Sequence, residues 1–160
     1  MLNLFQKNLF KIIFLLSIFS LISAYFIEYI LGHQPCNLCL YERIPYFFAI
    51  ILTLLSFKFK HFQKIINILL IIVFFVATLL SLYHLGIEQG LIQESMICSL
   101  QGDSALLSKE EILKQLQQKN VNCKDVTFKI FGLSLTTFNI LISFLLTVFL
   151  SKMYLDHGKN

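Results

Sequence analysis

Four long apolar stretches constrain the fold of this chain more than any other feature of its sequence. They cover about residues 9–31, 40–57, 65–86 and 131–154. Each reaches roughly the 20 residues that a helix needs to cross a hydrocarbon core of about 30 Å. Because 57% of the 160 residues are hydrophobic and only 14% are charged, lipid must be the main solvent of the chain. We therefore predict an all-α membrane protein, a four-helix transmembrane bundle that forms one domain over residues 1–160.

The first stretch also has features of a signal peptide, with Lys7 and Lys11 near its start and Ser23 and Ala24 near its end. Its apolar run is longer than the roughly 7–15 residues that are usual for such a peptide. We therefore expect this stretch to be an uncleaved membrane anchor.

The lysines predict how the chain is oriented in the membrane. The segments before the first stretch, between the second and third, and after the fourth contain a single acid, Asp156. The basic residues of these segments and of the adjoining ends of the first and fourth stretches are Lys7, Lys11, Lys58, Lys60, Lys64, Lys152 and Lys159. Because basic residues in short loops stay in the cytoplasm, we expect both termini and residues 58–64 on that side. The net charge of +4 therefore indicates membrane topology and does not favour nucleic-acid binding.

The four cysteines all fall on the opposite, outer side of the membrane. Cys36 and Cys39 lie in or beside the first outer loop, about residues 32–39, and Cys98 and Cys123 lie in the second, about residues 87–130. An even number of membrane crossings separates the two pairs, so they share one compartment. Outside a bacterial inner membrane, or in an equivalent lumen, thiols meet oxidants and disulfides persist.

The second outer loop is the main polar part of the sequence. Ser108 and Glu111 have the spacing of a capping box, with serine at the N-cap and glutamate at N3. Ile112, Leu113 and Leu116 then fall on one side of the helix that follows. We expect a short amphipathic helix here, packed either on the protein or on the membrane surface.

Three kinds of chemistry are open to four outer cysteines: structural disulfides, a metal site and redox exchange. A disulfide within Cys-x-x-Cys closes a very small ring, which constrains the unfolded chain little and favours an exchangeable bond over a structural one. Cys98 and Cys123 lack the paired short spacing that is typical of a zinc ribbon. We therefore favour redox exchange for Cys36, Cys39, Cys98 and Cys123 and assign no metal ligand.

Cys39 is placed to have a lowered pKa. Its sulfur lies near the start of the second span, where the helix dipole favours negative charge, and Arg43 follows four residues later on the same face. Thiolates of low pKa attack and leave readily in disulfide exchange. Because Pro45 disfavours helical geometry at Ile44, we predict a kinked or re-entrant start of this span.

Arg43 and His84 suggest what accepts the electrons. A dithiol that gives up two electrons needs an acceptor, and the adjacent lipid can hold a quinone. Arg43 could donate a hydrogen bond to a quinone carbonyl, or it could anchor the span at lipid headgroups. His84 could donate a hydrogen bond or a proton to the quinone, or it could form an interfacial polar pair with Glu88. Glu28 is assigned a structural role only.

Three short motifs and a separated pair of cysteines occur in order along the chain. The first, Gln-Pro-Cys-Asn-Leu-Cys-Leu-Tyr-Glu-Arg, runs from Gln34 to Arg43. It is followed by Tyr83-His84-Leu85-Gly86-Ile87-Glu88, by the separated pair Cys98 and Cys123, and by Phe131-Gly132-Leu133-Ser134 at the start of the fourth span. Together with the four spans, these motifs resemble those of the bacterial disulfide-bond-formation protein B family, DsbB.

The resemblance implies a quinone-dependent thiol oxidase of the bacterial inner membrane, an electron-transport protein that acts with chaperones in disulfide-bond formation. Its soluble partner would be a periplasmic DsbA-like protein with a thioredoxin fold, and its cofactor would be ubiquinone or menaquinone. The partner would attack Cys98, and electrons would pass through Cys98 and Cys123 to Cys36 and Cys39.

In the same resemblance the quinone site consists of Cys39, which engages the quinone, together with Arg43 and His84. Two other interpretations remain open. Electrons could flow in reverse, as in vitamin-K-epoxide-reductase-like proteins, which also use a membrane Cys-x-x-Cys, although Tyr41-Glu42-Arg43 argues against this family. The non-enzymatic alternative is a four-cysteine metal-binding or structural membrane protein.

Overall fold

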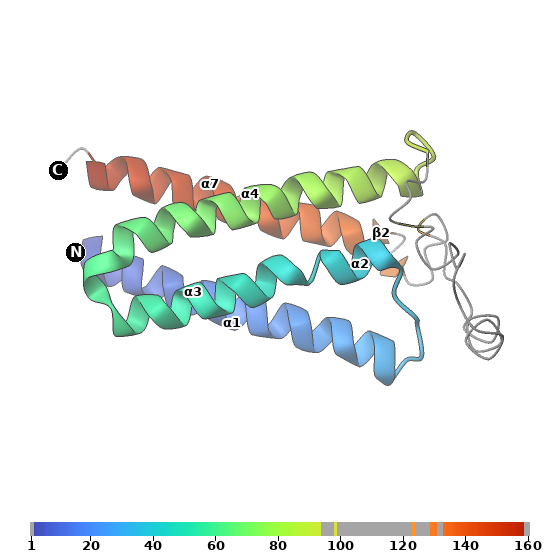
Figure 1. Ribbon diagram of the computed structural model, residues 1–160, viewed down its shortest axis with the longest axis horizontal. Helices are drawn as coiled ribbons and strands as arrows, with labels where there is room; N and C mark the ends of the chain where they lie inside the picture. Colours follow the sequence, from blue (N-terminus) through green and yellow to red (C-terminus); the bar gives the residue numbers. More distant parts are fainter. Residues whose placement is uncertain (1, 94–97, 99–122, 124–128, 131–132, 159–160) are drawn as a thin grey trace, which may run out of the picture.

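The computed structural model describes residues 2–93, 98, 123, 129–130 and 133–158 (Figure 1). Along the chain, its elements are α1 (Leu2–Tyr29), α2 (Asn37–Tyr41), α3 (Ile44–Lys58), the short 3-10 helix η1 (Lys60–Phe62), α4 (Gln63–Glu88), β1 (Lys129–Ile130), β2 (Leu133–Ser134) and α7 (Leu135–Gly158). Four segments of this described part are long and apolar enough to cross a membrane: Asn8–Tyr29, Asn37–Lys58, Gln63–Glu88 and Leu135–Leu155. They confirm the predicted all-α fold with a four-helix transmembrane bundle.

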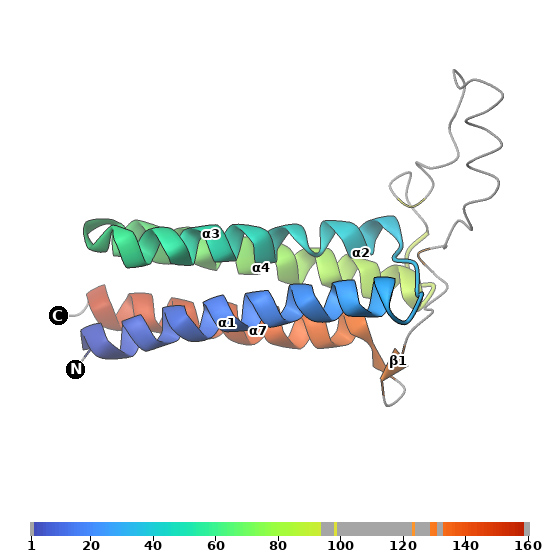
Figure 2. The same ribbon diagram turned by 90° about the horizontal axis from the view of Figure 1, so that it is seen from below.

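The four spans lie side by side along the long axis of the molecule (Figures 1 and 2). α1 packs mainly against α3, α3 also packs against α4, and α4 packs along α7. Both chain termini lie at one end of the bundle, whereas α2, β1 and β2 lie at the opposite end. The end that carries α2 is therefore the one at which the first cysteine pair is found.

Side chains on the surface of the bundle are large and apolar, whereas many side chains between the helices are small. Phe19 is 69% exposed and Leu15 is 63% exposed. Hydrocarbon tails solvate such side chains, and helices associate in lipid through close packing that small residues allow. The small buried residues of the four spans include Ser17, Ala49, Thr53, Ser56, Ala77, Thr78, Ser81, Thr136 and Ser143. This distribution is the one that a bundle in lipid requires.

The second span has a kinked start, as Pro45 predicts. Two residues, Glu42 and Arg43, separate α2 from α3, and Pro45 lies in the first turn of α3. The carbonyl of Arg43 accepts the backbone N–H of Tyr46 at 3.2 Å, so α3 starts a new hydrogen-bond ladder there. Proline has no N–H to donate and fits the first turn of a helix, where that donor would lack a partner. The break places Glu42 and Arg43 in a turn beside the thiols.

The fourth span starts later than the sequence predicts. β1 and β2 pair as antiparallel strands, with Lys129 opposite Ser134, and α7 begins only at Leu135. A helix from residue 131 is therefore wrong at its start, because the backbone of β2 bonds to β1 instead of opening the helix. The hairpin leads the chain into α7 at the same end of the bundle as α2 (Figure 2).

α4 ends in a left-handed turn at Gly90, whose φ is 73°. The N–H of Leu91 donates to the carbonyl of Gly86 at 2.9 Å, and the N–H of Gly90 donates to that of Ile87 at 3.0 Å, which is the Schellman pattern. Most of the second outer loop follows this turn. The amphipathic helix predicted to begin at Ser108 lies in that loop, outside the described residues.

Candidate functional site

Cys36 and Cys39 lie at the start of α2, and both are free thiols. Cys36 is the N-cap residue of α2, and its Sγ accepts the backbone N–H of Cys39 at 3.3 Å. The two Sγ atoms are 2.7 Å apart. Rotation of the side chains can shorten this separation to the covalent S–S distance of about 2.05 Å. The pair can therefore close and open a disulfide with little movement of the backbone.

The thiol of Cys36 is more acidic than an ordinary cysteine thiol. The hydrogen bond with the Cys39 thiol lowers the pKa of Cys36, burial raises it, and the hydrogen bond and electrostatic attraction of His84 lower it further. The net result is a pKa lowered from 9.0 to about 5. The sequence favours Cys39 as the acidic sulfur because Arg43 follows it. In the structure, the contacts that stabilise a thiolate gather instead on Cys36.

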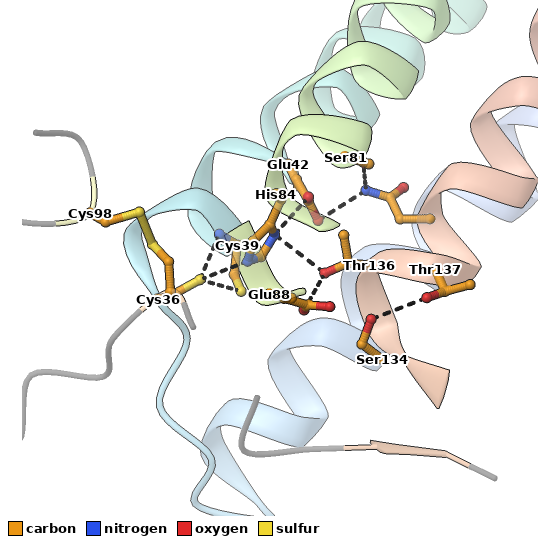
Figure 3. A network of polar contacts seen from close by, with 12 residues as sticks. Cys36, Cys39, Glu42, Ser81, His84, Glu88, Cys98, Ser134, Thr136 and Thr137 are labelled. Carbon is orange, nitrogen blue, oxygen red and sulfur yellow. Dashed lines mark hydrogen bonds and ion pairs between the residues drawn. A yellow bond between two sulfur atoms is a disulfide. The ribbon is translucent and has the colours of Figure 1, made fainter. Parts of the chain in front are cut away.

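His84 links the thiol pair to a buried carboxylate (Figure 3). Its Nε2 lies 3.5 Å from Cys36 Sγ, and its Nδ1 lies 2.9 Å from Glu42 Oε1. His84 is only 2% exposed, so both contacts are shielded from water. A carboxylate on one ring nitrogen fixes the orientation of an imidazole and stabilises a proton on the ring. Cys36, His84 and Glu42 thus form a hydrogen-bonded relay through which the proton of the Cys36 thiol can be transferred to His84.

Thr136, at the start of α7, connects His84 with a second carboxylate. Its Oγ1 lies 3.3 Å from His84 Nδ1 and donates a hydrogen bond to Glu88 Oε1 at 3.0 Å. The sequence places His84 and Glu88 on one face of their helix, and the structure joins them through this threonine (Figure 3). The histidine therefore lies within reach of polar groups from three spans.

Asn139, one turn further along α7, holds the other oxygen of Glu42. Its Nδ2 donates to Glu42 Oε2 at 3.1 Å and to Ser81 Oγ at 2.8 Å. Its Oδ1 accepts the hydroxyl hydrogen of Tyr46. Buried polar groups are stable when each finds a partner, and this asparagine satisfies groups from α3 and α4 at once. Asn139 therefore fixes the position of the Glu42 carboxylate, which in turn orients the ring of His84.

Arg43 is held by α1. Its Nη1 lies 2.6 Å from Glu28 Oε2, and its guanidinium carbon lies 5.0 Å from the centre of the Tyr25 ring. The side chains of Arg43 and Glu28 are 12% and 21% exposed, so the ion pair is largely shielded. A guanidinium has several N–H donors in a fixed fork. Arg43 can therefore keep this pair and still donate to a molecule bound beside it.

A cavity of about 420 Å³ opens beside these groups. Its polar wall includes Cys36, Cys39, Glu42, Arg43 and His84. Most of its apolar lining comes from α1 and α7: Leu16, Phe19, Leu21, Ala24, Ile27, Leu135, Phe138 and Ile142. An apolar cavity with a few convergent polar groups is typical of a site for a small, mostly apolar molecule.

Cys98 and Cys123 form a disulfide. Both cysteine pairs meet in one apolar group of side chains, the cysteine cluster, in which Figure 3 shows the disulfide beside Cys36. Its members are the buried Cys36, Leu38, Ile87 and Cys123, with Cys39, Leu80, Tyr83 and Cys98 packed against them. Sulfurs joined in a disulfide are not thiolate ligands, which disfavours a four-cysteine metal site.

The structure brings the residues singled out in the sequence to one place. Cys36, Cys39, Arg43, His84 and Cys123 line the cavity, and Cys98 is joined to it through its disulfide.

Several polar residues of the site were not assigned a role from the sequence: Glu42, Tyr46, Ser81, Thr136 and Asn139. Glu28 was considered only as a structural residue. Polar side chains within or beside apolar spans are expensive in lipid, and this is the signal that could have identified them.

The chain matches the family described as Disulfide bond formation protein DsbB over residues 6–153. It is also similar to a protein of Rickettsia prowazekii (strain Madrid E) named Uncharacterized protein RP370, with 34% identity over 154 residues. That similarity covers 92% of this chain and 90% of the Rickettsia protein. The family match includes all four spans almost completely and every residue of the site described above.

Proposed function

Because the chain belongs to the DsbB family of membrane disulfide oxidoreductases, we propose that it is a quinone-dependent thiol oxidase. It takes two electrons from a periplasmic DsbA-like partner with a thioredoxin fold and passes them to a quinone in the bacterial inner membrane. The observation that carries this proposal is the cysteine cluster, in which a disulfide and a dithiol pack together beside a cavity. Exchange between two cysteine pairs requires this closeness.

The Cys98–Cys123 disulfide receives the electrons first. A thiolate of the reduced partner attacks Cys98 Sγ, the Cys98–Cys123 bond breaks, and Cys123 leaves as a thiolate. The second partner thiol displaces Cys98, so the partner departs with a disulfide and both chain cysteines are reduced. Exchange with an oxidised Cys36–Cys39 pair then restores the Cys98–Cys123 disulfide. The combination of one disulfide and one dithiol matches the stage reached after this exchange.

Oxidation of the Cys36–Cys39 dithiol releases two electrons and two protons. A quinone, if bound in the cavity, would be the acceptor for both. His84 takes the proton of Cys36 at Nε2, and Glu42 stabilises the charged ring at Nδ1. The thiolate left on Cys36 makes the pair a better electron donor than two neutral thiols. The apolar lining of the cavity keeps water from this exchange.

Cys39, Arg43 and His84 are the residues that would hold the quinone. Arg43 offers donors for a quinone carbonyl, and the side chains of α1 and α7 offer an apolar surface for the ring and its tail. The cavity volume of about 420 Å³ is typical of small-molecule sites, which measure roughly 300–1,000 Å³. A ring of the size of ubiquinone or menaquinone therefore suits the cavity.

The orientation of the protein follows from its charges. The turn that contains Lys58 and Lys64 lies at the same end of the bundle as both termini, and α2 lies at the other end (Figure 2). We assign the lysine-rich end to the cytoplasm and the cysteine pairs to the periplasm, where disulfides persist.

Quinone reduction in proteoliposomes tests this function. Purified protein that receives a reduced thioredoxin-fold partner should convert the quinone to quinol, and Cys39→Ser should abolish the conversion. Cys98→Ser should stop reduction by the partner but retain reduction by dithiothreitol, which is small enough to attack the Cys36–Cys39 disulfide directly. Turnover by Cys39→Ser at the wild-type rate would exclude the proposed mechanism.

A further inference from the structure

The reduced thiol pair also has the composition of a metal site. Among the described residues, the ligand atoms of Cys36, Cys39 and His84 lie within 4.8 Å of one another. We propose that these three residues bind a thiophilic divalent cation, Zn²⁺, whenever the pair is reduced, and that the bound cation blocks electron transfer. The binding is argued from the geometry of the three residues, whereas the block rests on the proposed function.

The spacing of the ligand atoms suits tetrahedral zinc. Bonds of about 2.3 Å to sulfur and about 2.0 Å to nitrogen place those two ligands about 3.6 Å apart. Cys36 Sγ and His84 Nε2 are 3.5 Å apart. The two sulfurs are 2.7 Å apart and would have to separate to about 3.8 Å. Cys39 is half-buried and lines the cavity, so rotation of its side chain provides that separation.

The side chains that would support the zinc ligands from behind are already in place. Metal-bound histidines typically donate their other ring N–H to a carboxylate, which fixes the ring and raises its basicity. His84 Nδ1 lies 2.9 Å from Glu42 Oε1, which leaves Nε2 directed at the sulfur of Cys36. Glu42 is itself fixed by Asn139, which donates to Oε2 at 3.1 Å. No rearrangement of the histidine is needed for it to act as a ligand.

Charge balance favours the cation. Two thiolates and a neutral imidazole compensate a divalent cation completely, so the complex avoids the cost of an isolated charge in a partly buried place. Two cysteines and one histidine with an open fourth position are also a known ligand set for zinc. The fourth position is accessible from the cavity, which all three ligands line.

Binding and electron transfer exclude one another. In the disulfide form, Cys36 and Cys39 have no thiolates to offer, so the cation binds only the reduced pair. Conversely, sulfur electrons shared with a metal are not available to form the S–S bond. A cation in the outer compartment would therefore trap the protein in its reduced state.

Cobalt titration tests the site directly, because Co²⁺ takes the same ligands as zinc and absorbs light when bound to thiolate. In the Cys98→Ser/Cys123→Ser variant, the remaining thiols of the chain are Cys36 and Cys39. After anaerobic reduction, one equivalent of Co²⁺ should produce a thiolate charge-transfer band that Zn²⁺ then removes. The same variant should show no band after oxidation.

Substitutions identify the ligands. Cys39→Ala and His84→Gln should each weaken Co²⁺ binding at least tenfold, and Glu42→Gln should weaken it about 10–100-fold, as expected for an outer-layer carboxylate. His61→Gln is the matched control, because His61 lies in η1 at the other end of the bundle. This variant should bind Co²⁺ as tightly as the parent protein does. The absence of the charge-transfer band in the reduced protein would overturn the site. So would Co²⁺ binding that is equally tight after oxidation, or equally tight in Cys39→Ala.

The block is measured in a single turnover. The Cys98→Ser/Cys123→Ser variant is reduced, freed of reductant, loaded with Zn²⁺ and mixed with a quinone, and quinol formation should be at least tenfold slower until a chelator is added. Unchanged quinol formation by protein that retains zinc would overturn the block and leave the binding site standing. Metal-free protein that forms no quinol would refute the proposed function, and the block with it, without affecting the cobalt result.

Discussion

The guanidinium of Arg43 lies 2.6 Å from the carboxylate of Glu28, which joins the start of α3 to α1 at the edge of the cavity. The sequence predicts that Arg43 either donates a hydrogen bond to a quinone or anchors the span at the lipid headgroups, and it assigns Glu28 a structural role only. The ion pair is largely shielded, with the two side chains 12% and 21% exposed. We therefore expect Glu28 to hold the guanidinium of Arg43 at the wall of the cavity, which Arg43 lines.

Arg43→His should raise the quinone KM about tenfold with a smaller change in kcat. A hydrogen bond from a charged donor contributes about 1.5–3 kcal/mol, and most of this contribution is lost when the donor is shortened. Glu28→Gln should raise KM by a smaller factor, because Arg43 remains but loses its fixed direction. Steady-state quinone reduction at several quinone concentrations measures both values.

The alkylation rate of Cys36 is the control for these two variants, because neither residue contacts that thiol in the described structure. It should be unchanged in Arg43→His and Glu28→Gln. A quinone KM in Arg43→His equal to that of the wild type would return Arg43 to an anchoring role at the membrane surface.

The reactivity of Cys36 should depend on pH with a midpoint near 5. Because the pKa of Cys36 is lowered from 9.0 to about 5, its thiolate fraction rises as pH increases through that value and is nearly complete at pH 7. Iodoacetamide reacts with the thiolate, so the rate of alkylation at Cys36 follows this fraction. Mass spectrometry of the reduced Cys98→Ser/Cys123→Ser variant measures the rate without disulfide exchange.

His84→Gln should move this midpoint upward, because it removes a hydrogen bond and an electrostatic attraction that favour the thiolate. His61→Gln should leave the midpoint in place. A midpoint close to 9 in the Cys98→Ser/Cys123→Ser variant that retains His84 would show that the contact between Cys36 and His84 does not stabilise the thiolate.

Asn139→Leu should both destabilise the bundle and slow quinone reduction. Leucine has nearly the same size but cannot donate to Glu42 Oε2 or to Ser81 Oγ. A buried polar group that loses its partner costs about 1–3 kcal/mol, which thermal unfolding in detergent would register as a lower Tm. Ser143→Ala removes a longer contact to Asn139, at 3.3 Å, and leaves the two bonds that Asn139 donates in place, so it should cost less. Equal Tm values for Asn139→Leu and the wild type would contradict a supporting role for this residue.

The spans could be predicted because lipid imposes a length on each apolar run. The structure places them at Asn8–Tyr29, Asn37–Lys58, Gln63–Glu88 and Leu135–Leu155, within a few residues of the sequence estimate at most ends. The start of the fourth span was missed, since a pair of two-residue strands leaves no periodic pattern to detect. The kink at Pro45 was predictable because it follows from the covalent structure of proline.

The partners within the site could not be predicted in the same way. Asn139 lies 97 residues from Glu42 along the chain, and their contact depends on how α7 is rotated about its axis. Apolar runs that are hydrophobic on every side contain little information about that rotation. For the same reason the sequence paired Arg43 with Cys39 along one helix, whereas the structure pairs it with Glu28 across two.

Cysteine labelling should place the two ends of the bundle on opposite sides of the membrane. In a background that lacks the four native cysteines, Leu91→Cys lies just beyond α4, at a position that is 78% exposed, and His61→Cys lies in the lysine-rich turn. Because basic residues stay in the cytoplasm, a membrane-impermeant maleimide should label Leu91→Cys in intact spheroplasts and His61→Cys only after permeabilisation. Labelling after denaturation in detergent controls for the presence and reactivity of both thiols. The reverse pattern would place the redox cysteines in the cytoplasm, where a periplasmic partner could not reach them.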